Sequence, residues 1–166
     1  MTLLLAAVGA TVTAILELSL GPYLRVGIAQ PHFVLVLGVV ITIALGLEAG
    51  LIFGFIGGAA LDVLAQRPLG STAFAMLLCV GGCYLLSRLV TRLRPILPIP
   101  ATSIFSLVYS MIAFVALNAL RGAIPVADPV GAIMPGAVYD TMLATLIGPL
   151  AVSIHDRRAT GERADW

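Results

Sequence analysis

Long apolar stretches recur along almost the whole chain, and each is about as long as a helix that crosses a lipid bilayer. Such a helix needs about 20 mostly apolar residues, because the hydrocarbon core is about 30 Å thick. The 166-residue chain is 60% hydrophobic and 10% charged, with a mean hydropathy of +1.11, whereas an ordinary soluble domain is about 25% charged. This composition excludes a soluble globule, a disordered chain and a secreted disulfide scaffold. We therefore predict an all-α, polytopic integral membrane protein.

Glycine and proline divide the apolar sequence into six predicted spans. Gly21-Pro22 ends the first span. The apolar block 33–64 is too long for one span, since as a single helix it would measure about 48 Å, and we place a break at Glu48, which lies between Gly46 and Gly50. The predicted spans form one compact six-helix domain over residues 1–154, with a polar tail at 155–166; they are 3–20, 33–47, 50–66, 71–87, 101–120 and 136–154.

The placement of arginine predicts the orientation of these spans. All nine basic residues are Arg, and with six spans the side that holds both chain ends carries most of them. The positive-inside rule puts that side in the cytoplasm, so we expect cytoplasmic termini. The inner residues are the connector Arg88, Arg92 and Arg94 and the tail Arg157, Arg158 and Arg163; the outer ones are Arg25, Arg67 and Arg121. No basic block is dense enough for nucleic acid, whose binding depends on phosphate neutralisation.

Small residues form two rows at helical spacing. Gly50, Gly54 and Gly58 recur every four residues in the third predicted span, and Asp62 continues the row. Missing side chains let a neighbouring backbone approach closely, which is how helices associate in lipid. The row is therefore either a packing surface inside the chain or a docking face for another membrane protein. The first predicted span has a second row of this kind, made of Ala6, Ala10 and Ala14.

Acidic residues lie near the outer ends of three predicted spans. An unpaired carboxylate in hydrocarbon costs several kcal/mol, so each must face the protein interior, a partner or water. One hypothesis is a single outer polar cluster that locks helices or contacts a partner. The alternative is separate side chains that reach the lipid headgroups. The predicted cluster consists of Glu17, Arg25, Asp62, Arg67 and Asp140.

The sequence offers little for enzyme chemistry. It has no HExxH, no GxSxG and no paired Asp at metal-binding spacing. Cys79 and Cys83 are too few for a zinc site, which usually has four ligands, and are typical of buried packing residues. His155 lies in the tail and His32 in a connector, at the depth of the outer acids, and a histidine in such a place is usually solvated. We therefore predict no catalytic residues, no metal and no cofactor.

The third predicted span carries a family resemblance. Its motif elements are Gly50, Gly54-Phe55, Gly58, Asp62-Val63-Leu64 and Pro68-Leu69-Gly70, with Pro31 before the second span and Val138-Tyr139-Asp140 and Gly148-Pro149-Leu150 in the last. In this pattern the chain resembles the rod shape-determining protein MreD family. It departs at His32, where the family usually has an acid, and at Asp140, where it commonly has Asn.

The resemblance implies a non-enzymatic scaffold or regulator of side-wall peptidoglycan synthesis in the bacterial inner membrane. The implied partners are MreC, the glycosyltransferase and transpeptidase of the elongasome, and indirectly MreB. It also implies a fold similar to the S components of energy-coupling-factor transporters. The row that ends at Asp62 would be the first docking face, and the inner arginine connector the second.

That similarity of fold leaves an alternative function. The chain could be a substrate-binding S component of a vitamin or metal transporter, whose coupling protein would meet the face of Ala6, Ala10 and Ala14. Against this, few aromatic or amide side chains are placed to line a vitamin pocket, since Asn118 is the only Asn and Gln30 and Gln66 are the only Gln.

Overall fold

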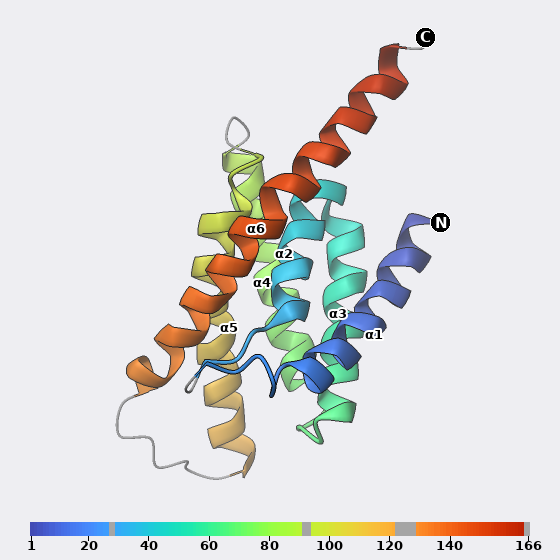
Figure 1. The fold of residues 1–166 in the computed structure, drawn as a ribbon. Coiled ribbons are helices and arrows are strands. Elements are labelled where there is room, and N and C mark those ends of the chain that lie inside the picture. Colours follow the sequence, from blue (N-terminus) through green and yellow to red (C-terminus); the bar gives the residue numbers. More distant parts are fainter. Residues whose placement is uncertain (27–28, 91–93, 122–128, 165–166) are drawn as a thin grey trace.

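The computed structural model describes residues 1–26, 29–90, 94–121 and 129–164, and in these ranges the protein is all-α (Figure 1). The predicted connector residue Arg92 lies outside the described residues. The helices are α1 (Thr2–Leu20), α2 (Phe33–Leu45), α3 (Leu47–Leu64), α4 (Ser71–Leu89), α5 (Pro98–Arg121) and α6 (Pro129–Ala164).

Five of the helices in the described ranges are long and apolar enough to cross a membrane, and α2 is apolar but shorter. With 13 residues, α2 is about 20 Å long, which is less than the thickness of the hydrocarbon core. It lies between α1 and α3 on one side and α5 and α6 on the other (Figure 1) and contacts all five other helices. Nine of its 13 residues are buried, which explains why its sequence is apolar on every face.

A single glycine separates α2 from α3. Gly46 has φ +99°, a backbone conformation that L side chains rarely adopt. Glu48, where the sequence indicated the break, instead lies in the first turn of α3. A carboxylate is favourable there because the start of a helix carries partial positive charge.

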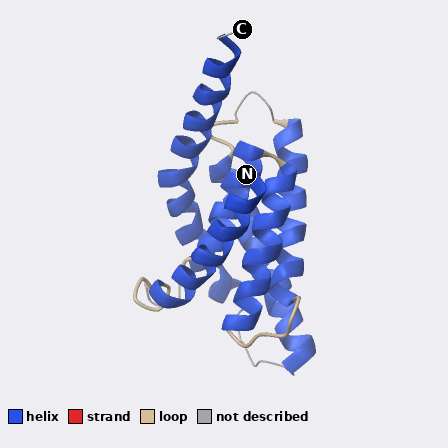
Figure 2. Cartoon of the chain, turned by 90° about the vertical axis from the view of Figure 1, so that its right-hand side faces the viewer, coloured by secondary structure: helices blue, strands red, loops and turns tan. Residues whose placement is uncertain are grey.

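The last helix is longer than the span expected at 136–154. It begins at Pro129 and continues through most of the polar tail to Ala164, so that its end extends beyond the other helices (Figure 2). Proline is tolerated in the first turn of a helix, and the arginine, alanine and glutamate of the tail are good helix formers.

The connections fall on two ends of the protein. Both termini lie on the same side as the break between α2 and α3 and the end of α4 (Figure 1). The starts of α2, α4 and α6 lie at the opposite end. That end therefore presents several helix N-termini, whose free N–H groups require hydrogen-bond acceptors.

Candidate functional site

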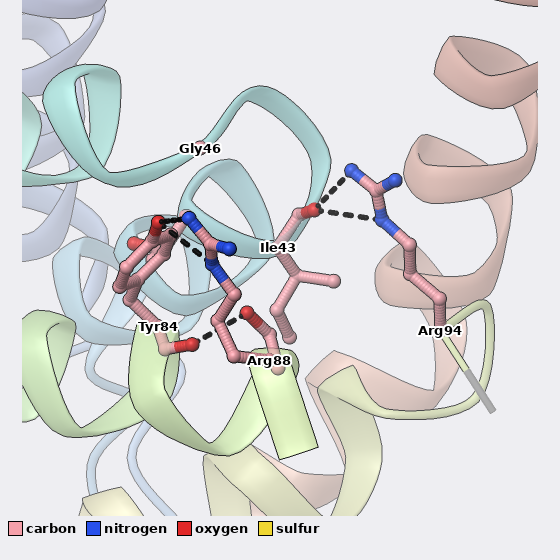
Figure 3. Close-up of a pocket in the computed structure, with 7 residues that line it drawn as sticks. Ile43, Gly46, Tyr84, Arg88 and Arg94 are labelled. Atoms are coloured by element: carbon pink, nitrogen blue, oxygen red, sulfur yellow. Dashed lines mark hydrogen bonds between the residues drawn. The ribbon is translucent and has the colours of Figure 1, made fainter. Parts of the chain in front are cut away.

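The described inner arginines lie where α2 and α4 end. Arg94 donates hydrogen bonds to the carbonyl oxygens of Ile43, at 2.9 and 3.2 Å, and of Ala44, at 3.2 Å. Arg88 donates two hydrogen bonds to the hydroxyl of Tyr84, at 2.6 and 2.9 Å (Figure 3). These two arginines therefore line one region at the end of the protein that holds both termini.

At the other end, the carboxylate of Asp62 lies at the start of α4. It is fully buried, and it accepts hydrogen bonds from the N–H groups of Gly70 at 2.9 Å and Thr72 at 3.0 Å. The hydroxyl of Ser71 donates a further bond at 3.2 Å. A side chain of α3 thus satisfies the free N–H groups of α4, and its charge is favourable against the dipole of that helix.

The chain between α3 and α4 turns sharply enough to permit this contact. Gln66 has φ +52° and Gly70 has φ +89°. The N–H of Arg67 donates to the backbone carbonyl of Asp62 at 2.9 Å, which is the pattern of a Schellman C-cap. Pro68 then prevents α3 from continuing. The segment from Asp62 to Gly70 is therefore a compact turn that brings the start of α4 back to the carboxylate.

The glycine row faces α4 and α2. A Cβ atom at Gly58 would lie 2.6 Å from the Cα of Ala73, and one at Gly54 would lie 3.2 Å from a methyl group of Val80. A Cβ atom at Gly50 would meet the side chain of Thr42. The absence of side chains on this row lets α3 and α4 approach closely next to Asp62.

The alanine row of α1 is also turned inward. Ala6 is 6% exposed, and Ala10 and Ala14 are 0% exposed. A Cβ atom at Gly57 of α3 would lie 3.6 Å from the Cβ of Ala10, so this row packs on α3. Because these alanines are covered by the chain itself, they give no support for the transporter alternative.

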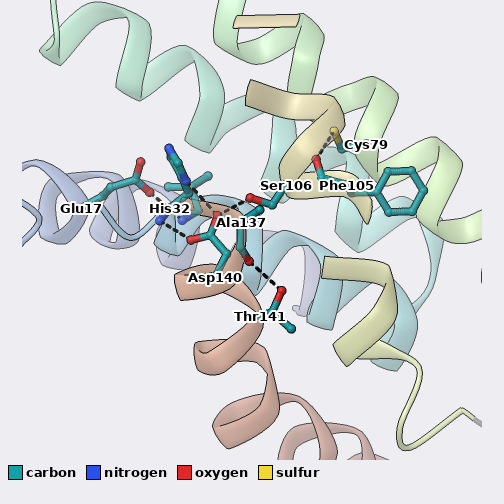
Figure 4. A network of polar contacts seen from close by, with 9 residues as sticks. Glu17, His32, Cys79, Phe105, Ser106, Ala137, Asp140 and Thr141 are labelled. Atoms are coloured by element: carbon teal, nitrogen blue, oxygen red, sulfur yellow. Dashed lines mark hydrogen bonds and ion pairs between the residues drawn. The ribbon is translucent and has the colours of Figure 1, made fainter. Parts of the chain in front are cut away.

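Glu17 and Asp140 meet at the start of α2. The carboxylate of Glu17 is 5% exposed and accepts a hydrogen bond from the N–H of Val34 at 2.8 Å. Asp140 is fully buried and accepts bonds from the backbone N–H of His32 at 2.8 Å and from the hydroxyl of Ser106 at 2.5 Å. Side chains from α1, α5 and α6 are therefore joined at one helix start (Figure 4).

His32 is the central residue of the polar group at the start of α2. Its Nδ1 lies 2.8 Å from Asp140, and its ring meets the ring of Tyr109 edge-on, with centroids 5.3 Å apart. Burial by itself lowers the pKa of His32, but the hydrogen bond and charge of Asp140 and the charge of Glu17 outweigh this effect. The net result is a pKa above the ordinary value of 6.5, so the protonated, ion-paired form is favoured.

The predicted outer residues thus fall into two groups. Glu17 and Asp140 share the start of α2, whereas Asp62 holds the start of α4. Arg67 is half-buried and its charge opposes protonation of His32. Arg25 is exposed in the connector after α1. His32 and Asp140 form an ion pair.

Sequence reasoning did not predict the hydrogen bond of Ser106 to Asp140 or the ion pair of His32 with Asp140. A histidine directly before a helix, in a chain with a buried aspartate, is a weak signal for such a contact. In the part of the chain that the structure describes, no three His, Cys, Asp or Glu side chains are grouped to hold a metal ion. The carboxylates accept hydrogen bonds from helix starts, an arrangement that holds helices together rather than one that exposes an acid to a substrate.

The family model of rod shape-determining protein MreD matches residues 1–127. The chain belongs to the MreD family. Comparison with curated proteins and with solved structures gave no significant match. The match spans α1 to α5 and includes Glu17, His32 and Asp62, whereas Asp140 lies beyond it.

Family membership gives this MreD-family protein a role in rod shape determination. The family is a shape-determining membrane protein family and not a known enzyme family. Together with five helices able to cross a membrane, the match fits a bacterial inner-membrane protein.

Proposed function

We propose that this MreD-family protein is a non-enzymatic membrane scaffold of the cell-elongation machinery. It holds MreC and the elongasome glycosyltransferase and transpeptidase together by helix–helix contacts, and it acts on MreB indirectly. The main support for this proposal is that the buried carboxylates hold helices together. Glu17, Asp62 and Asp140 all accept hydrogen bonds from backbone N–H groups at helix starts. A rigid membrane body built in this way suits a protein that positions others.

The proposed arrangement has six transmembrane helices in one compact bundle, similar in fold to the S components of energy-coupling-factor transporters. The helix α2 can take part despite its length, because its five neighbours rather than lipid surround it. Both termini are proposed to be cytoplasmic. The presence of Arg88 and Arg94 at the end that holds both termini supports this orientation through the positive-inside rule.

The small-residue rows have a packing role in this proposal. Gly54 and Gly58 pack α3 against α4, and Gly50 packs it mainly against α2, which leaves the outer faces of these helices for lipid or partners. Phe55 of α3 and Phe74 of α4 are more than half exposed there. A scaffold that stimulates synthesis must bind the active arrangement of its partners more tightly than the inactive one.

Gene deletion in the host, followed by purification, tests the proposal. We expect deletion to convert rods to rounded cells, and a tagged copy that restores rods to co-purify with MreC in mild detergent. Rod shape that persists after deletion would contradict the role in elongation. A tagged copy that restores shape but brings down neither MreC nor the synthases would contradict the scaffold mechanism.

A further inference from the structure

Apolar side chains are exposed in the connector after α1, at the end of the protein opposite the termini (Figure 1). Tyr23 is 87% exposed and Val26 is 67% exposed, and both Leu24 and Leu20, in the last turn of α1, are exposed as well. The proposed function makes no use of these side chains. We call residues 21–26 the connector segment.

The backbone of the connector segment is held by hydrogen bonds at both of its ends. The N–H groups of Tyr23 and Leu24 both donate to the carbonyl oxygen of Leu20 at 3.0 Å, which continues the last turn of α1. Val26 and Ala29 exchange two hydrogen bonds of 3.0 Å, and Ala29 is buried. The exposed apolar side chains are therefore carried on a backbone that is tied to the rest of the protein.

Gly21 keeps the connector close to the end of α1. A Cβ atom at Gly21 would lie 2.6 Å from the Nε2 atom of Gln30, so the returning chain packs against the last turn of the helix. The connector runs across this end of the bundle rather than away from it (Figure 1). The exposed side chains of the connector segment therefore lie at about the depth at which α1 ends.

The length of α1 indicates where this depth lies in a membrane. The helix is apolar enough to cross a bilayer. With 19 residues, it is about 28 Å long, which is close to the thickness of the hydrocarbon core, about 30 Å. When α1 spans the membrane, Leu20 lies at the boundary of the hydrocarbon, and the connector segment lies among the lipid headgroups.

The residue types of the connector segment suit the headgroup region. Tyrosine is enriched there, because its ring is apolar and its hydroxyl forms hydrogen bonds. The segment has no Asp or Glu. Its one charged residue is Arg25, and the aliphatic stem of an arginine can lie along apolar surface while its charge stays at the headgroups.

We propose that the connector segment is a membrane-surface anchor, whose side chains Tyr23, Leu24 and Val26 insert into the headgroup region of the bilayer. The partner of this surface is lipid rather than protein, because the segment begins where the span ends and exposes apolar and aromatic side chains. The N–H of Gly21 donates to the backbone carbonyl of Glu17 at 2.9 Å. Insertion therefore fixes the turn of α1 whose Glu17 carboxylate accepts from the start of α2.

Tryptophan fluorescence of the full-length protein in vesicles tests the anchor. Trp166 is the only Trp, so Trp166→Phe provides a background in which Tyr23→Trp is the one tryptophan. The control in the same background is Phe55→Trp, in the middle of α3. Both substitutions replace an exposed aromatic side chain, so both variants should fold. The vesicles are phosphatidylcholine with bromine, which quenches tryptophan, placed near the headgroups in one preparation and near the ends of the acyl chains in another.

We expect the emission of Tyr23→Trp to lose more intensity with bromine near the headgroups, and that of Phe55→Trp to lose more with bromine near the chain ends. The emission of Tyr23→Trp should also lie at shorter wavelength than that of tryptophan in water. Emission at the wavelength of tryptophan in water that neither lipid quenches would overturn the proposal, and so would greater quenching of Tyr23→Trp by bromine near the chain ends. Emission that neither lipid quenches but that shifts to shorter wavelength when purified MreC is added would replace the anchor with a protein-binding surface.

Discussion

Replacement of Gly58 by alanine tests whether the close approach of α3 and α4 stabilises the protein. The added Cβ atom would lie 2.6 Å from the Cα and 2.8 Å from the N of Ala73, so two backbones must separate. Overpacking of this kind costs about 1–3 kcal/mol in the free energy of unfolding. Displacement of α4 also weakens the hydrogen bonds of Asp62, and complete loss of such a helix cap costs about 1 kcal/mol. Alanine regains up to about 1 kcal/mol of helix propensity.

The net expectation for Gly58→Ala is a loss of about 1–3 kcal/mol in the free energy of unfolding. At about 2–4 °C per kcal/mol for a chain of this size, its Tm should fall by several degrees in a thermal scan of purified protein. Gly81→Ala is the matched control in the same helix pair, because a Cβ atom there meets nothing within 4 Å. Gly54→Ala should lie between them, since its Cβ atom would be 3.2 Å from a side-chain methyl group of Val80. Equal Tm values for Gly58→Ala and Gly81→Ala would refute the reasoning.

Three other predictions concern Asp62, His32 and the two thiols. Asp62→Ala should lose about 1–3 kcal/mol in the free energy of unfolding, because buried N–H groups of α4 lose a charged acceptor. The control Glu48→Gln, at an exposed residue, should change Tm little. Similar losses in Tm for both variants would contradict the capping role of Asp62. Because the pKa of His32 is raised, the stabilisation from its ion pair is fully present below pH 6.5 and is lost as the pH rises through the higher pKa of the folded state. Tm should therefore fall above pH 6.5, and His32→Gln should flatten that dependence; an unchanged slope would count against the pair. Cys79 and Cys83 are both 0% exposed, so maleimide should label them only after unfolding in SDS, and stoichiometric labelling of the folded protein would disprove this packing.

The sequence predicted structure best where residues of one kind recur at a regular helical spacing. A glycine at every fourth residue before Asp62 predicts a helix with one face that lacks side chains, because those positions lie on the same face. The structure places that side against α4. The identity of the facing helix could not be predicted, since any neighbouring backbone can use such a surface.

The hydrogen-bond partners of the acids were the harder part to predict. Sequence reasoning set Glu17 and Asp62 beside arginines, and the charge of Arg67 does act on Glu17. The hydrogen bonds of both acids, however, come from backbone N–H groups. Almost every residue has such a group, so the partner leaves no signature in the sequence. His32 and Asp140 are 108 positions apart. The sequence placed both at the outer end of the bundle, but only the folded chain shows the bond between them.

The contact between His32 and Asp140 has a consequence for the order of assembly. A nascent chain that has not reached α6 can already place Glu17 at the N–H of Val34, but it lacks the carboxylate that accepts from His32. The start of α2 therefore gains its full set of hydrogen bonds only after α6 has been translated. In a product cut short before Asp140, the N–H of His32 at the start of the most enclosed helix would lack this acceptor, a defect open to membrane quality-control proteases.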